Sequence, residues 1–307
     1  MDPQLIVSGF TFRLSSRLLS SPFLYKLSRF LNKLFGSFFR IAISRYSSTI
    51  SFYSTRDDSR LYPNQSLQDK SSYLNIGSGF FSHPKWICID LPAKTAIYSA
   101  IQGKINHDFL PADLNRYSLR TLFIAESFYA VYSSHTLEHL SRSVLKTLFI
   151  DFHYILKKNG VFRICVPDLQ SLFSVLQISQ LDSDSNKMLF FLKESYTPLY
   201  SYVVNLEPSE STNFIKEICT HVRGASLEEV LSYITKLYCS LGLKDTFPPD
   251  FHISYPTAPF LQKLAAEAGF SYSYVTCRAA SASSVFSNKY LFDTTIPDMS
   301  LYMEFVK

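Results

Sequence analysis

Tyr73-Leu-Asn-Ile-Gly-Ser-Gly-Phe80 is the segment from which the fold of this 307-residue chain can be predicted. Its apolar residues lead directly into Gly77-Ser78-Gly79, which is typical of a buried parallel strand that ends in a tight turn. Glycine there allows a positive φ and lets a ligand approach the backbone closely. A second apolar run, Trp86-Ile-Cys-Ile89, ends at Asp90. A strand, a glycine turn, a helix and a second strand with an acidic end form the pattern of a nucleotide-type cofactor site.

The residues after the glycine turn narrow the choice of cofactor. A dinucleotide fingerprint has a third glycine near position 82, and this chain has Ser82 there. A diphosphate therefore fits the turn poorly, which disfavours an NAD-type oxidoreductase. A cofactor without phosphates suits the turn better, and S-adenosylmethionine is the first choice. The Asp90 carboxylate can accept hydrogen bonds from both ribose hydroxyls.

Strands and helices alternate beyond this point. Strands are expected over Ile105–Leu110, Phe128–Ser134 and Val161–Val166, with a helix after the second of them. This alternation predicts a parallel sheet with helices on both faces, in which ligands bind at the carboxyl ends of the strands. The candidate ligand residues all stand at such strand ends: Gly77, Asp90, Asp108, Ser133 and Asp168.

Five segments together carry a family resemblance: Leu74–Gly79, Trp86–Asp90, His107-Asp108, Tyr132–Leu140 and Leu156–Asp168. In this order and spacing they resemble the class I S-adenosylmethionine-dependent methyltransferases, and most nearly the poorly characterised group that shares the type-11 signature. The likeness covers about residues 71–170, a third of the chain. It implies a Rossmann-like fold with a mostly parallel, seven-stranded sheet.

The resemblance also implies roles for individual residues. Asn75 stands where many relatives carry an acid, so it can accept a hydrogen bond but offers no charge to the cofactor's ammonium group. The resemblance further implies that the methionine part of the cofactor lies over Gly77, Ser78 and Gly79 and that Asp90 binds the ribose. It places the adenine at Asp108 and Phe109. Ser133, Ser134 and His135 would line the floor between cofactor and acceptor.

His135 is the candidate general base, because methyl transfer to a hydroxyl requires a group that takes up the proton. Transfer to a thiolate or a deprotonated phenol needs no base, since alignment of methyl and acceptor does most of the work. The segment His135-Thr-Leu-Glu-His139 also matches H-x-x-E-H, a zinc-peptidase motif in which both histidines share a helix face. The helix is expected to begin only at about His135, so we favour a packing role for His139 and expect no metal.

Residues 1–56 carry the positive charge of the chain. They hold eight basic residues and one acid, a net charge of +8 − 1 = +7, so the rest of the chain sums to +5 − 7 = −2. Phe and Leu recur at helical spacing from Phe23 to Ala42, which predicts an amphipathic helix with four basic residues opposite: Lys26, Arg29, Lys33 and Arg40. Three interpretations stay open, namely packing on the parent domain, attachment to an anionic membrane surface and an organelle transit peptide.

The expected organisation is therefore a basic helical extension over residues 1–56, a polar linker over 57–70 and a methyltransferase domain over 71–307. Deletion of residues 1–56 is expected to leave the domain folded. A helical insertion over about 170–250 is expected to determine the acceptor. No apolar run reaches the ~18–20 residues that a transmembrane helix needs.

The leading functional hypothesis is S-adenosylmethionine-dependent methyl transfer to a small-molecule, glycan or lipid-linked acceptor. The alternative is a non-catalytic protein that keeps this fold as a binding or scaffold module. Nucleic acid is not an expected partner, because the domain is net acidic and the basic segment is amphipathic. The five cysteines are scattered singly, which is typical of reduced thiols in a cytoplasmic protein, with residues 1–56 as the candidate contact to a membrane.

Overall fold

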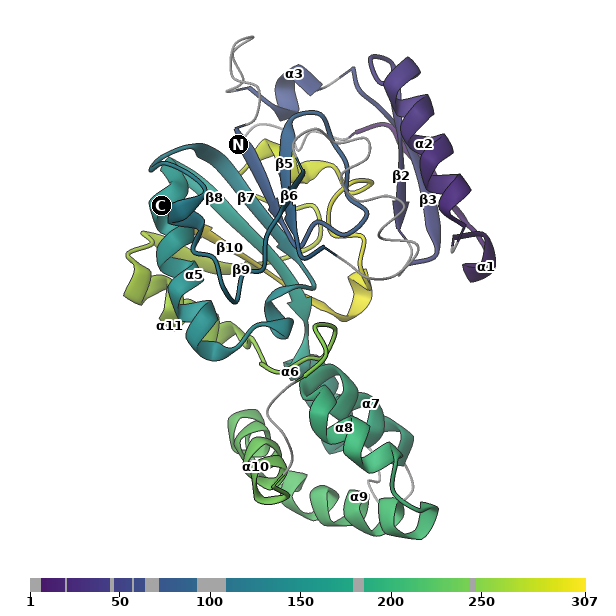
Figure 1. Ribbon diagram of the computed structural model, residues 1–307, viewed down its shortest axis with the longest axis vertical. Coiled ribbons are helices and arrows are strands. Elements are labelled where there is room, and N and C mark those ends of the chain that lie inside the picture. Colours follow the sequence, from purple (N-terminus) through teal and green to yellow (C-terminus); the bar gives the residue numbers. More distant parts are fainter. Residues whose placement is uncertain are drawn as a thin grey trace.

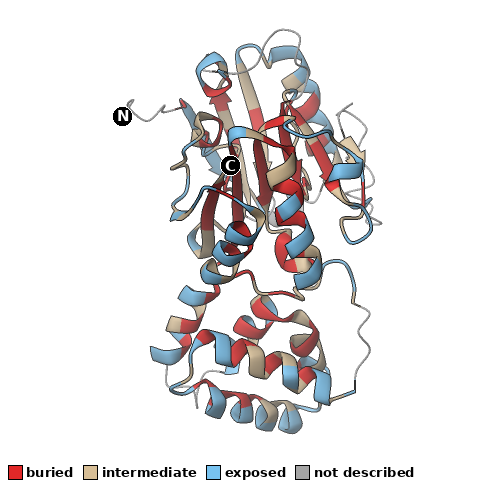
Figure 2. Ribbon diagram, turned by 90° about the vertical axis from the view of Figure 1, so that its left-hand side faces the viewer, coloured by how far each residue is buried: buried red, intermediate tan, exposed pale blue. Residues whose placement is uncertain are grey.

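The computed structural model describes residues 7–19, 21–44, 47–56, 58–63, 72–92, 109–178, 185–242 and 247–307. The chain forms a large sheet, a small N-terminal sheet with helix α2 beside it, and a separate group of helices joined to the large sheet through α6 (Figure 1). Buried residues concentrate in the strands of the large sheet and on the inward sides of the helices (Figure 2).

The large sheet has the strand order β6-β5-β4-β7-β8-β10-β9. All pairs from β6 to β8 are parallel, whereas β10 runs antiparallel to both of its neighbours. The mostly parallel, seven-stranded sheet expected from the sequence is thus confirmed. Its strands are β4 (Tyr73–Ile76), β5 (Trp86–Asp90), β6 (Phe109–Pro111), β7 (Phe128–Ser134), β8 (Leu156–Pro167), β9 (Tyr272–Thr276) and β10 (Ser300–Val306).

The strand order reverses beside β4, which lies between β5 and β7. In an open parallel sheet, connections on either side of such a reversal pass over opposite faces and leave a crevice at the carboxyl ends of the strands. The crevice here is flanked by Gly77, directly after β4, and by His135, directly after β7. This places the glycine turn where the fold favours ligand binding.

The two faces of the large sheet are covered differently. Helices α5 (Arg142–Ile155) and α11 (Ala258–Ala268) pack on one face, against apolar residues such as Leu74 and Ile76 of β4. Aromatic residues dominate the other face, where Tyr73 and Trp86 meet side chains from the N-terminal segment and from residues 285–292. Short 3₁₀ helices occur at Leu119–Thr121 (η1), Leu137–His139 (η2), Ser284–Ser287 (η3) and Pro297–Met299 (η4).

The connection between β4 and β5 differs from the expected pattern, because residues 77–85 form turns and no helix. Only nine residues separate the strands, and Pro84 restricts the residue before it to an extended conformation. The place beside the turn is taken instead by α2 (Pro22–Phe35), whose Tyr25 stacks on Phe80 with ring centroids 4.6 Å apart. The N-terminal segment therefore supplies the helix that the crossover lacks.

The N-terminal extension is not helical throughout, which corrects the prediction of one helix reaching Ala42. Helix α2 ends at Phe35, and Phe38 and Ala42 belong to the turn and the strand that follow. The side chain of Asn32 accepts a hydrogen bond from the Ile41 N–H at 2.7 Å and donates to its carbonyl at 2.9 Å, which fixes the strand against the helix. The other elements are β1 (Gly9–Arg13), α1 (Ser16–Leu19), β2 (Phe39–Ser44) and β3 (Thr49–Ser54), with antiparallel strands in the order β1-β3-β2.

Helix α2 turns its polar side inward and its apolar side outward. Tyr25, Ser28 and Arg29 are buried, whereas Phe23 is 70% exposed and Phe30 is 57% exposed. Arg29, one of the four basic residues predicted opposite the apolar stripe, is thus buried against the protein. The apolar stripe does not pack on the parent domain within the described residues, because its members Phe23, Leu27, Phe30 and Leu34 are exposed.

The predicted linker is folded over its described part. Residues Asp58–Leu61 form α3, and Leu61 and Tyr62 are buried in the aromatic core. The hydroxyl of Tyr62 accepts a hydrogen bond from Trp86 Nε1 at 3.1 Å. Residues 57 and 64–70 lie outside the described residues.

The helices between β8 and α11 form a lobe with its own apolar core, which we call the helical lobe (Figure 1). The lobe lies in the stretch, about residues 170–250, over which the sequence predicts a helical insertion. None of the described helices is long and apolar enough to cross a membrane. The helices of the lobe are α6 (Leu169–Ile178), α7 (Ser185–Ser195), α8 (Thr197–Val204), α9 (Pro208–Val222) and α10 (Leu227–Ser240).

Candidate cofactor site

The glycine turn after β4 has the backbone conformation that its sequence predicts. Gly77 and Gly79 have φ angles of +66° and +52°, which side chains with a Cβ rarely adopt. The N–H groups of Gly77 and Ser78 both donate to the carbonyl of Ile89, at 2.8 and 3.1 Å. The turn is thereby fixed to the end of β5.

Asp90 closes this arrangement from the end of β5. Its Oδ2 accepts a hydrogen bond from the Gly79 N–H at 2.7 Å, and its Oδ1 accepts one from the Leu91 N–H at 2.8 Å. An ionised carboxylate only accepts hydrogen bonds, so this group suits a ligand that carries hydroxyl groups. The carboxylate is thus oriented by the protein before any ligand arrives.

Gly77 also faces a neighbour that the sequence does not indicate. A Cβ at this position would lie 1.9 Å from Thr136 Oγ1, which is far inside van der Waals contact. Thr136 follows β7, and its hydroxyl donates to the Ser134 carbonyl at 3.1 Å. The glycine is therefore required by the protein's own loop, in addition to any approach of a ligand.

A cavity of about 930 Å³ lies beside the turn, near the upper end of the roughly 300–1,000 Å³ typical of small-molecule sites. One of its walls comes from the N-terminal extension, which contributes Tyr25, Ser28, Arg29 and Asn32 of α2. Burial lowers the pKa of Arg29 from its ordinary value. Sequence reasoning missed this wall, because the apolar stripe of α2 was the only signal for which side faces inward.

Most of the predicted site residues meet at this cavity. The predicted site residues that line the cavity are Asn75, Gly77, Ser78, Gly79, Asp90, Ser134 and His135. Phe109 and Ser133 are not among the described lining residues. Side chains alternate along a strand, so Ser133 points with Val131 toward the face that α5 and α11 cover. Asp108 lies outside the described residues.

His135, the candidate base, is held by the protein at both ring nitrogens. Its Nε2 lies 2.9 Å from Ser300 Oγ, and its Nδ1 lies 3.3 Å from Glu138 Oε1. Burial lowers the pKa of His135, but contacts with Cys165 and Glu138 outweigh this and raise it to about 10. A positive φ of 47° adds backbone strain at this residue. A protonated ring offers no lone pair, so the role of His135 as a base stays a prediction that this geometry does not favour.

The H-x-x-E-H segment does not form the helix of a zinc peptidase. Leu137–His139 is a single 3₁₀ turn, and α5 begins only at Arg142. His135 and His139 consequently do not share a helix face. Burial raises the pKa of Glu138, but the His135 contact outweighs it and lowers the pKa to about 2.

Comparison with known proteins gives distant matches of fold. A scan against models of known protein families gave no match, and neither did a search of curated proteins. Among solved structures, a SAM-dependent methyltransferase from Archaeoglobus fulgidus is 14% identical, with a TM-score of 0.38, over 81% of this chain and 91% of that one. An S-adenosylmethionine-dependent methyltransferase from Mesorhizobium loti is 13% identical, with a TM-score of 0.37, over 82% of this chain and 97% of that one. PKMT2 from Rickettsia typhi, in complex with AdoHcy, is 13% identical, with a TM-score of 0.38, over 82% of this chain and 51% of that one.

The fold assignment rests on the strand order and on the glycine turn at its reversal point. The chain has the class I methyltransferase fold.

Proposed function

We propose that this chain binds S-adenosylmethionine at the glycine turn and transfers its methyl group to a small-molecule, glycan or lipid-linked acceptor. The observation that carries the proposal is the Asp90 carboxylate, which two backbone N–H groups orient at the cavity beside two glycines with positive φ. When bound, the cofactor supplies a methyl group on a positively charged sulfur.

The residues of the cavity suit the polar parts of this cofactor. The Asp90 carboxylate is the group that would accept the two ribose hydroxyls in charge-assisted hydrogen bonds. The turn exposes backbone without a Cβ at Gly77 and Gly79, and Arg29 adds a positive charge to the opposite wall, which favours a carboxylate ligand. Asn75 at the end of β4 provides a neutral polar group.

The acceptor is expected at the other end of the cavity. There the lining passes from His135 and His139 to Pro249 and Asp250, which stand in the segment that returns from the helical lobe. Variation in the lobe and in this segment can therefore change the acceptor and leave the backbone contacts of Asp90 intact.

Calorimetric titration of the full chain with S-adenosylmethionine tests the proposal. We expect saturable binding that Asp90→Ala weakens strongly. Lys187→Ala, at an exposed position of α7 in the lobe, is the matched control and should leave binding unchanged. The absence of binding heat at high cofactor concentration would favour the scaffold alternative.

We further propose that the protein attaches peripherally to anionic membranes through α2. The support is the outward apolar stripe Phe23, Leu27, Phe30 and Leu34, which Lys26 and Lys33 flank at exposed positions. Helices with this pattern lie in the membrane interface. Each Lys or Arg near an anionic surface adds about 1 kcal/mol, and salt screens this attraction.

Sedimentation of the full chain with lipid vesicles tests this attachment. We expect binding to phosphatidylserine vesicles above that to phosphatidylcholine, falling with salt without vanishing. The double variant Phe23→Ser/Phe30→Ser should lose binding, whereas Ile178→Ser, which removes an 86% exposed apolar side chain from the helical lobe, should not. Equal, negligible binding to both vesicles at low salt would refute the attachment.

A further inference from the structure

A buried carboxylate lies at the junction between the large sheet and the helical lobe. Glu138, in η2, is 1% exposed, and neither of its oxygens accepts a hydrogen bond within the described part of the chain. Its close charged neighbour is His135, with Nδ1 at 3.3 Å from Oε1. A buried carboxylate has about four lone-pair sites, and leaving them unmet is costly.

Two histidines present a free ring nitrogen beside this carboxylate. The Nδ1 of His139 lies 3.1 Å from the carbonyl oxygen of Phe251, and the Nδ1 of His252 lies 2.8 Å from that of Glu194. A carbonyl oxygen only accepts, so each Nδ1 carries the hydrogen and each Nε2 keeps its lone pair. This is the arrangement by which proteins orient metal-binding histidines.

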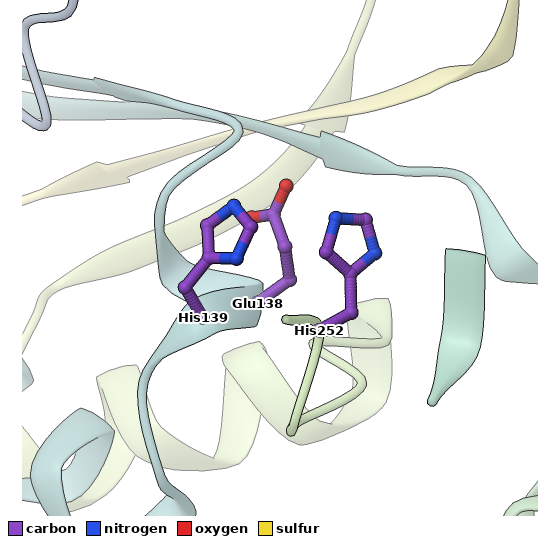
Figure 3. Close-up of side chains that lie close together, drawn as sticks. All are labelled: Glu138, His139 and His252. Atoms are coloured by element: carbon purple, nitrogen blue, oxygen red, sulfur yellow. The ribbon is translucent and has the colours of Figure 1, made fainter. Parts of the chain in front are cut away.

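The three side chains converge, with one ligand atom from each lying within 4.8 Å of the other two. Figure 3 shows the imidazole rings of His139 and His252 on either side of the Glu138 carboxylate. The ring centroids of the two histidines are 4.9 Å apart. A single ion can reach all three groups after small side-chain movements.

Backbone contacts hold the cluster together. The N–H groups of Ile253 and Ser254 donate to the Glu138 carbonyl at 2.9 and 3.1 Å, which ties the loop that carries His252 to η2. The His252 N–H donates to Thr197 Oγ1 at 2.9 Å, and the Thr197 N–H donates to the His252 carbonyl at 2.9 Å. The ligands are therefore fixed from the sheet and from the helical lobe at once.

We propose that Glu138, His139 and His252 bind one divalent transition-metal ion. Two imidazoles with one carboxylate match the donor sets of zinc sites with an open position and of non-haem iron(II) sites. Mg²⁺ and Ca²⁺ prefer all-oxygen ligands and are disfavoured here. Three protein ligands leave at least one coordination position for an outside ligand.

The ion would lie next to the acceptor end of the cavity, which His139 lines. A hydroxyl oxygen bound at the open position loses its proton to solvent at a lower pH than a free hydroxyl does. The site would thus supply the activation that a hydroxyl acceptor needs. This role rests on the proposed methyl transfer, whereas binding of the ion does not.

Metal content of the full chain tests the site. Protein without a polyhistidine tag is stripped with a chelator, exposed separately to Zn²⁺, Co²⁺, anaerobic Fe²⁺ and Mg²⁺, dialysed and analysed by mass spectrometry. We expect about one Zn²⁺ or Co²⁺ per chain and visible ligand-field bands with Co²⁺. His139→Ala and His252→Ala should each weaken binding by at least about tenfold. The control His221→Ala removes an exposed imidazole of α9 and should bind as the parent does.

If the variants misfold, the metal content of the parent protein tests the proposal by itself. Failure to retain Zn²⁺, Co²⁺ or Fe²⁺, or variants that retain ions as well as the parent, would overturn the proposal. Calorimetry with S-adenosylmethionine on the same samples separates the two proposals. Metal binding without cofactor binding would support the site and refute the proposed function, and the reverse result would refute the site alone.

Discussion

Two acidic side chains can be compared: Asp90, which lines the cavity, and Glu138, which is buried behind the lining residues His135 and His139. Asp90 accepts two backbone hydrogen bonds from residues within eleven positions of it. Glu138 accepts none within the described chain, and the nearby imidazole of His252 comes from 114 positions further along. Asp90 is thus held by nearby backbone, whereas the close charged partner of Glu138 among the described residues is His135.

Gly77→Ala should have the largest effect, because Thr136 links the two ends at this point. A positive φ and a Cβ 1.9 Å from Thr136 Oγ1 both oppose the substitution. The protein should therefore lose about 3 kcal/mol or more of unfolding free energy in urea titrations. Gly77 would then serve the packing of the loop after β7 as well as any ligand.

Thr136→Gly combined with Gly77→Ala should recover part of that loss, since it removes the clashing side chain. If the double variant is as unstable as the sum of the single variants, the contact with Thr136 is not the cause.

Asp90→Ala should weaken binding of S-adenosylmethionine by about 2–4 kcal/mol in calorimetry, through loss of charge-assisted bonds to two hydroxyls. Asp90→Asn keeps one acceptor oxygen and should lose less. A loss under about 0.5 kcal/mol for Asp90→Ala would remove this carboxylate from the ribose contacts.

Zn²⁺ should stabilise the protein by about 2.7 kcal/mol at a free concentration about a hundredfold above its dissociation constant. Chemical unfolding with and without Zn²⁺ measures this increment. His252→Ala should abolish it and Asp90→Ala should preserve it, because the two ends are separate. An increment that Asp90→Ala removes equally would contradict this independence.

Ser300→Ala should have the smallest effect, about 1 kcal/mol of unfolding free energy, because it removes the oxygen at 2.9 Å from His135 Nε2. Cofactor affinity should not change. The same hydroxyl donates to the carbonyls of Thr295 and Ile296 at 3.1 and 2.8 Å. A stability loss above about 3 kcal/mol would exceed what these hydrogen bonds explain.

The difference between the two ends also explains what the sequence could predict. The strand, the glycine turn and Asp90 are contiguous, so local pattern and spacing predicted the sheet and most cofactor-end residues. The helix expected between β4 and β5 was wrong, although the short connection with Pro84 carried a signal against it.

Non-local features could not be predicted in the same way. Amphipathicity places Phe23 and Arg29 on opposite sides of α2 but does not say which side meets the protein. Here the side that carries Arg29 lines the cavity, and Phe23 is exposed. No local pattern joins His252 to His139, because their proximity depends on a loop that returns from the helical lobe.

The wall that the N-terminal extension gives to the cavity has a consequence for synthesis. Ser44 donates to the carbonyl of Thr294, 250 positions later, at 3.0 Å. The hydroxyl of Tyr290 likewise donates to the carbonyl of Gly9 at 2.7 Å. At about 5–20 residues per second, a ribosome adds the segment between Ser44 and Thr294 in roughly 12–50 s. During that interval the exposed aromatic residues of the N-terminal segment lack these partners, so the wall can close only after Thr294 has been synthesised.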